Sequence, residues 1–169
     1  MSIKTDGICQ IALVVRDIEA TVRNYEEMFG LKGLKIENLP KPNEIPAYYR
    51  GKPGDFSGCK ICAFKLGPVV LELVQPDDTP SPWKEFLDKH GEGVQHIGFM
   101  TEDKYAALED LEKMGCKPFH VGYYPNLTYI FVDTAGKFGV DFNIKQGNEH
   151  NEEKIAKLLA TPDEPIDSI

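Results

Sequence analysis

Apolar residues recur along the chain in short blocks whose spacing predicts alternating strands and helices. Nearly continuous or alternating apolar runs, which are typical of strands with at least one buried face, occupy residues 8–15, 59–66, 69–74, 94–100, 117–123, 127–133 and 139–145. Helices are predicted after Asp17, Ser81 and Thr101, where a side chain able to cap a helix precedes apolar residues at helical spacing. The Pro- and Gly-rich residues 31–58 are interpreted as a long excursion.

The two halves of the chain repeat each other. The segment QIALVVRD, from Gln10 to Asp17, runs in step with HIGFMTED, from His96 to Asp103. Near the end of each half, LELVQ and FNIKQ also correspond, so that Glu72 matches Asn143. An internal repeat of this kind indicates one structural unit used twice. The predicted order is therefore strand-helix-strand-strand-strand, two times, with one strand of the first copy poorly defined within residues 31–50.

Length and charge narrow the class of protein. The 169 residues suffice for one domain, which we place at 1–169 with modules at about 7–76 and 93–146 and an acidic tail at 147–169. The formal net charge of −8 disfavours nucleic acid and anionic membranes as partners. Neither a membrane-spanning apolar run nor a signal-peptide core is visible, so we expect a cytoplasmic protein.

Four motifs in the expected order carry a family resemblance. QIALVVRDIEATVRNYEEMFGL, GPVVLELVQP, GVQHIGFMTED and GKFGVDFNIKQ together resemble the vicinal oxygen chelate superfamily, closest to its glyoxalase I-like and methylmalonyl-CoA epimerase-like members. The superfamily also includes extradiol dioxygenases and bleomycin-resistance proteins. The resemblance implies an α+β fold in which two β-α-β-β-β modules form a curved mixed sheet around a cavity, with the helices outside.

The resemblance also implies a metal site with one ligand from each motif. The ligands would be Gln10, Glu72, His96 and Asn143. Each lies in mid-strand among apolar neighbours, so burial leaves it in need of a polar partner. Imidazole, carboxylate and amide oxygen suit one divalent ion such as zinc, nickel, cobalt, manganese or iron. The alternative is that the four are ordinary buried polar residues bonded to the backbone.

The fourth motif departs from the family pattern. Glutamate is usual there, and in glyoxalase-like members it both binds metal and moves a proton, whereas Asn143 has no useful basicity. Asp141 lies two residues earlier and should share its strand face. We therefore predict Asp141 as a displaced catalytic base, or as a replacement ligand.

Three further residues are predicted to bind substrate. Tyr48 and Tyr49 form an aromatic pair within the long excursion, and His120 lies in a predicted strand at a cavity-wall position of the family. The alternative for His120 is a histidine of the core or rim, and the alternative for the tyrosines is ordinary packing.

Two functions remain open from the sequence. The first is a metal-dependent lyase or isomerase of the glyoxalase I (lactoylglutathione lyase) or methylmalonyl-CoA epimerase type, which stabilises the enolate of a small carbonyl or acyl-CoA substrate. The second is a non-catalytic protein that sequesters a small molecule, as bleomycin-resistance proteins do. We expect a homodimer in either case.

Overall fold

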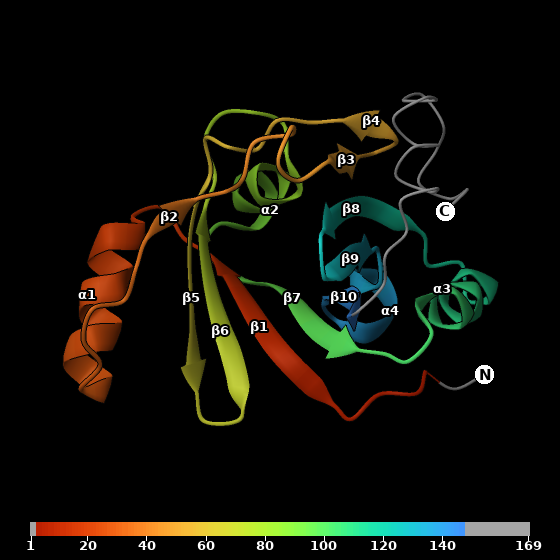
Figure 1. Cartoon of the computed structure of the whole chain (residues 1–169), viewed down its shortest axis with the longest axis horizontal. Helices are drawn as coiled ribbons and strands as arrows, with labels where there is room; N and C mark the ends of the chain where they lie inside the picture. Colours follow the sequence, from red (N-terminus) through yellow and green to blue (C-terminus); the bar gives the residue numbers. More distant parts are fainter. Residues whose placement is uncertain (1–2, 148–169) are drawn as a thin grey trace.

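A single curled sheet organises the molecule (Figure 1). The computed structural model describes residues 3–147. Within them the strands are β1 (Ile8–Val14), β2 (Glu37–Asn38), β3 (Ala47–Tyr49), β4 (Lys52–Pro53), β5 (Lys60–Leu66), β6 (Val69–Gln75), β7 (Gly93–Met100), β8 (Pro118–Tyr124), β9 (Leu127–Val132) and β10 (Asp141–Gly147). They join in the order β2-β5-β6-β1-β7-β10-β9-β8-β3-β4. The sheet is mixed, because β1 runs parallel to β6 and antiparallel to β7.

Four helices are found in the same part of the chain. They are α1 (Ile18–Phe29), α2 (Pro82–His90), α3 (Lys104–Lys113) and the single turn α4 (Ala135–Phe138). Asp17 caps α1 by accepting a hydrogen bond from Ala20 N, and Ser81 caps α2 in the same way through Lys84 N. The prediction that Thr101 caps the third helix is wrong: Asp103 does so, because its carboxylate accepts from the first free N–H groups of α3.

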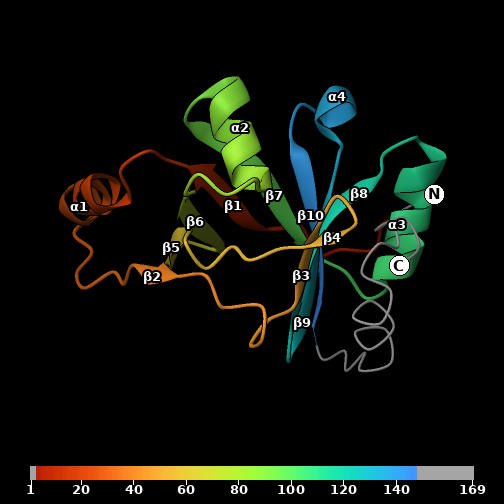
Figure 2. The same ribbon diagram turned by 90° about the horizontal axis from the view of Figure 1, so that it is seen from above.

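The repeat seen in the sequence is also a repeat in space. The first half contributes β2-β5-β6-β1 and the second contributes β7-β10-β9-β8, so β1 and β7 meet at the centre as equivalent strands. Helices α1 and α3 lie at opposite ends of the molecule, outside the sheet (Figure 2). The predicted α+β fold, a curved mixed sheet with outer helices, is confirmed.

The long excursion joins the two free edges of this sheet. From β2, at the edge of the first half, the chain runs through residues 39–46 to β3, which pairs with β8 at the far edge of the second half. We call residues 39–46 the strap. Figures 1 and 2 show it crossing from one side of the curled sheet to the other. The first half thus helps to complete the second.

Three groups of buried side chains form the core. One lies under α1, a second lies between α2 and the central strands, and the third joins β3 to α3 and the second half. No helix within residues 3–147 is long and apolar enough to cross a membrane. Residues 148–169, which include most of the predicted acidic tail, lie outside the described part of the chain.

Candidate functional site

The four residues matched by the repeat meet at the centre of the sheet. Gln10 on β1 donates from Nε2 to Glu72 Oε2 on β6 at 2.5 Å. Asn143 on β10 donates from Nδ2 to His96 Nε2 on β7 at 3.2 Å, and the same nitrogen lies 3.5 Å from Gln10 Oε1. The Glu72 carboxylate lies 4.0 Å from His96 Nε2. Each of the four central strands therefore contributes one polar side chain to a single cluster.

A glycine between them allows this meeting. Gly98 on β7 pairs with Gln10 on one side and with Asn143 on the other, so it lies directly between the two amides. A Cβ at this position would lie 2.9 Å from Gln10 Cβ and 3.0 Å from Gln10 Oε1. Because real Cβ atoms essentially never come so close to another carbon, only glycine leaves the amides free to approach across β7.

A neighbouring glutamine orients the His96 imidazole. The pairing of β1 with β7 shifts between Ala12 and Leu13, which leaves Gln95 as an extra residue on β7. Gln95 is buried beside His96, and its Oε1 lies 2.6 Å from His96 Nδ1. An amide oxygen can only accept, so Nδ1 carries the proton and Nε2 presents its lone pair to the cluster. Burial lowers the pKa of His96 well below its usual value, so the ring is neutral at pH 7.

The donor set fits a divalent ion. Metal–ligand bonds of about 2.0–2.2 Å leave room for an ion between His96 Nε2 and a Glu72 oxygen that lie 4.0 Å apart. Asn143 Oδ1 is buried and has no hydrogen-bond partner within residues 3–147. A half-turn of that amide would direct an oxygen, rather than the N–H₂ group, toward the cluster. The described residues contain no group of three or more His, Cys, Asp or Glu side chains suited to a metal, so an ion held here would need the two amides as further ligands.

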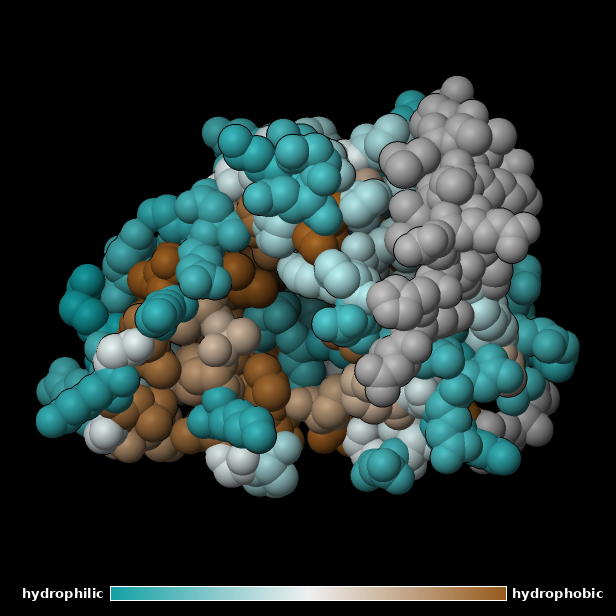
Figure 3. Space-filling view, in the orientation of Figure 1, coloured by the Kyte–Doolittle hydropathy of each residue, from teal (hydrophilic) through white to brown (hydrophobic). Residues whose placement is uncertain are grey.

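The cluster borders a cavity of about 220 Å³. Its described walls are mostly apolar or aromatic and contain one carboxylate: Leu39, Ile61, Glu72, Trp83, Tyr124, Leu127, Tyr129, Phe131, Asn143 and Lys145. In Figure 3 the face in view is hollowed in front of β1 and β7, with hydrophilic side chains inside and hydrophobic surface over β5 and β6 beside it. Burial raises the pKa of the Glu72 carboxyl.

Asp141 lies outside this cavity. Its Oδ1 accepts hydrogen bonds of 3.1 Å from Thr134 N and Ala135 N, at the start of α4. It lines a separate cavity of about 210 Å³ together with Glu85 and Gln95. Burial raises the pKa of Asp141, against the effect of the two N–H groups. The role of Asp141 as catalytic base stays a prediction, and its carboxylate is already engaged by α4.

The three predicted substrate-binding residues do not border the cavity beside Glu72 either. Tyr48 is buried in the core of the second half. The Tyr49 hydroxyl donates to the Glu85 carboxylate, and its ring lines a surface hollow by β4. His120 is fully buried behind the cavity wall, with its Nε2 3.1 Å from the hydroxyl of Tyr129. The substrate role of all three residues stays a prediction.

Sequence reasoning assigned no site role to Lys145, Tyr124 or Tyr129, which all line the cavity. The sequence does indicate a place for Lys145 near the cluster, because residues 141, 143 and 145 occupy every second position of one strand and should share a face. Desolvation by burial lowers the pKa of Lys145, and Glu72 partly offsets this. Burial also raises the pKa of Tyr124 and of Tyr129.

Comparison with known proteins places the chain in a family. The family model of the glyoxalase/bleomycin resistance protein/dioxygenase superfamily matches residues 9–131. The chain belongs to this superfamily. The match includes Gln10, Glu72 and His96 but ends before β10 and Asn143. Because β1 pairs with both β6 and β7, the three matched cluster residues lie on adjoining strands.

Individual relatives are distant. The uncharacterized protein YqjC of Bacillus subtilis (strain 168) is 25% identical over 147 residues, which cover 84% of this chain and 94% of that protein. A 4-hydroxyphenylpyruvate dioxygenase of Legionella pneumophila (strain Corby) is 40% identical, but over 52 residues, which make up 30% of this chain and 15% of that enzyme.

Solved structures share the fold. The methylmalonyl-CoA epimerase of Mycobacterium tuberculosis superposes with a TM-score of 0.61 at 17% identity and covers 93% of this chain and 95% of its own. A variant of the Streptomyces coelicolor methylmalonyl-CoA epimerase, in complex with 2-nitronate-propionyl-CoA, gives a TM-score of 0.57 at 21% identity, over 85% of this chain and 96% of its own.

Proposed function

We propose that the chain is an enzyme that removes a proton from the carbon beside a carbonyl group, as lyases of the glyoxalase I type and isomerases of the methylmalonyl-CoA epimerase type do. One observation carries the proposal. Side chains from four strands, Gln10, Glu72, His96 and Asn143, converge in one buried cluster at the wall of a cavity. The substrate class is a small carbonyl or acyl-CoA compound, and the superposed epimerases support it.

The cluster would hold one divalent ion. His96 would bind through Nε2, Glu72 through its carboxylate, and Gln10 and Asn143 through their amide oxygens. Gln95 supports this by holding the proton on Nδ1. When bound, such an ion supplies positive charge that stabilises the oxygen of the developing enolate.

Glu72 is the residue that we propose to accept the proton. It is the single carboxylate among the described residues that line the cavity. In the repeat it is equivalent to Asn143, where the family usually has the glutamate that moves the proton. Because the site is built from two equivalent halves, the first half can supply the base that the second half lacks.

Two measurements test the proposal. Protein purified without chelators should contain one divalent ion per chain, and His96→Ala should lose it while staying folded by circular dichroism. In deuterated water, NMR should show exchange of the proton beside the carbonyl of a bound substrate. Glu72→Gln should slow this exchange by roughly 10²–10⁴-fold, the usual contribution of a general base. If Asp141→Asn slowed the exchange by this factor and Glu72→Gln did not, Asp141 would be the base. A protein that contains no metal and shows no exchange would overturn the proposal.

A second candidate function is non-catalytic sequestration of a small molecule. Asn143, an amide where a basic group is usual, and Asp141, engaged in capping α4, favour it. This function requires ligand binding in the cavity without proton exchange in either the native chain or Asn143→Glu. Exchange in the native chain would exclude it.

A further inference from the structure

Lys145 brings a positive charge to the cavity. It lies on β10, two residues after Asn143, and lines the same wall as Glu72. Its side chain runs over Gly98 beside Gln10: a Cβ at position 98 would lie 3.4 Å from Lys145 Cε and 3.0 Å from Gln10 Oε1. The bare backbone of Gly98 therefore gives room to Lys145 as well as to the amide cluster.

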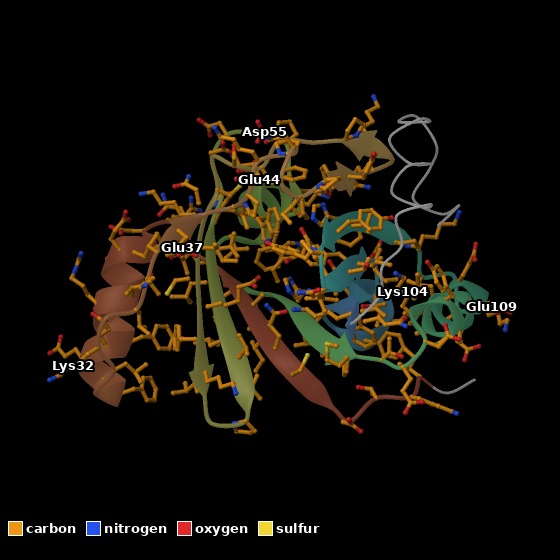
Figure 4. The ribbon with its side chains drawn as sticks, in the orientation of Figure 1. Lys32, Glu37, Glu44, Asp55, Lys104 and Glu109 are labelled. Carbon is orange, nitrogen blue, oxygen red and sulfur yellow. The ribbon has the colours of Figure 1, made fainter. Side chains whose placement is uncertain are left out.

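Among the described residues, no side chain binds the ammonium group of Lys145. Within residues 3–147 it forms no hydrogen bond or ion pair, although Glu72 is near enough to act on it electrostatically. The charged side chains labelled in Figure 4 at the periphery, Glu37, Asp55 and Glu109, lie far from the centre of the sheet. Lys145 is the one cation among the described residues of the cavity wall.

A second donor at the cavity also lacks a partner. Trp83 lines the same wall, is 3% exposed, and its Nε1 has no hydrogen-bond partner within the described residues. An indole N–H can only donate, and a buried donor without an acceptor costs free energy. Lys145 supplies the positive charge of this wall, and an anionic group on a ligand in the cavity would pair with it.

We propose that Lys145 binds a carboxylate group carried by the substrate, so that the substrate is a small carbonyl compound that is also an acid. The position of the carbonyl rests on the proposed function, which places it at the cluster of Gln10, Glu72, His96 and Asn143. The carboxylate then lies toward Lys145, farther along β10. The apolar side chains of Leu39, Ile61 and Phe131 take up the carbon skeleton, and the volume of about 220 Å³ restricts the part enclosed to a few carbons.

Ligand binding can be measured without turnover. Trp83 is the only tryptophan of the chain and lines the cavity, so its fluorescence reports an entering ligand. The probes are 2-oxopentanoate, its neutral methyl ester and inorganic phosphate. We expect the acid to bind at least about ten-fold more tightly than the ester, which corresponds to roughly 1.4 kcal/mol. Phosphate, an anion without the carbonyl and carbon chain, should bind more weakly than the acid.

Three variants complete the test. Lys145→Met should lose the preference for the acid over the ester, and Lys145→Arg should retain most of it because the charge stays. Lys65→Met removes the same charge from an exposed site on β5 and should behave like the native chain. Equal binding of acid and ester by the native chain, binding of neither, or a preference that survives in Lys145→Met would overturn the proposal.

The result of the binding test for Lys145 can be distinguished from the result of the proton-exchange test for the proposed function. A preference for the acid that depends on Lys145, without proton exchange in deuterated water, would keep the carboxylate site and overturn the enzyme. Proton exchange with equal binding of acid and ester would do the reverse.

Discussion

His120 is an ionisable residue held in a wholly nonaqueous setting. Its ring has no exposed surface and contacts the rings of Phe56, Trp83 and Phe131, with centroids 5.2, 5.3 and 4.9 Å away. Desolvation lowers its pKa to about 3, because a charged imidazolium would lose its hydration there. The alternative considered from the sequence, a histidine of the core, is the one this environment favours.

The stability of the protein should therefore depend on pH. Below the ordinary pKa of about 6.5, the unfolded chain protonates His120 and the folded chain does not, so unfolding becomes easier as pH falls. Well above that pH both states are neutral and the effect vanishes. Between pH 6.5 and 5 we expect the free energy of unfolding to fall by roughly 1.5 kcal/mol from this residue alone. Urea unfolding at several pH values measures it.

One variant separates the contribution of His120 from that of His96, which is also buried and neutral. His120→Phe should flatten the dependence on pH by the share of one histidine, whatever its effect on stability at pH 7. An unaltered slope in His120→Phe would contradict the expectation.

Single strands and helices are the part of the structure most accessible from the sequence. Strong apolar patterns predict the strands β1 and β5 to β10, and the repeat predicts that Gln10, Glu72, His96 and Asn143 correspond in pairs. The structure brings these four side chains together. Strand β3 is not predicted, because it has three residues in a Pro-rich segment and its neighbour β8 is distant in sequence.

The hydrogen-bond partners of side chains are also harder to predict, because they too depend on residues that are distant along the chain. The sequence presents Asp141 as a free carboxylate beside Asn143, but the turn of α4 folds its N–H groups back onto it. It presents Lys145 as an ordinary charged residue near the end of a strand. The curl of the sheet decides that Asp141 meets the end of α4 and that Lys145 meets the cavity. No local sequence pattern encodes that curl.

The role of Gly98 on the central strand β7 in bringing Gln10 and Asn143 together can be tested. Gly98→Ala introduces a Cβ against Gln10, so we expect Gln10 and Asn143 to separate and the affinity for a divalent ion to fall by roughly ten-fold, about 1.4 kcal/mol. Isothermal titration with zinc measures this. Gly136→Ala, on α4, meets nothing within 4 Å and is the matched control. Equal zinc affinity in the two variants would show that Gly98 does not govern the cluster.

At the scale of the whole molecule, the strap connects halves that otherwise repeat each other. Tyr48 comes from the first half, yet it packs with Leu108, Val121 and Ile144 of the second half and is 2% exposed. The two halves are thus joined by buried side chains at the β3 edge as well as by hydrogen bonds between β1 and β7.

Truncating the side chain of Tyr48 should show how much the contact between the two halves contributes to stability. Tyr48→Ala should lower the free energy of unfolding by about 3–5 kcal/mol, as large-to-small changes of buried aromatic residues do. Tyr48→Phe should cost little, because the hydroxyl has no partner within the described residues. Chemical unfolding followed by circular dichroism compares them. Similar losses in both variants would mean that the hydroxyl, rather than the ring, is what matters.

The connection from β2 to β3 also imposes an order on biosynthesis. A chain leaves the ribosome N-terminus first, and its domains fold as they emerge. Ala47–Tyr49 is made early, but its sheet neighbour β8 is made only after α2, β7 and α3. During that interval the nascent protein exposes Tyr48, an aromatic side chain that the finished molecule buries. Translation through β8 is therefore the step after which this segment can gain its sheet neighbour and bury the Tyr48 ring.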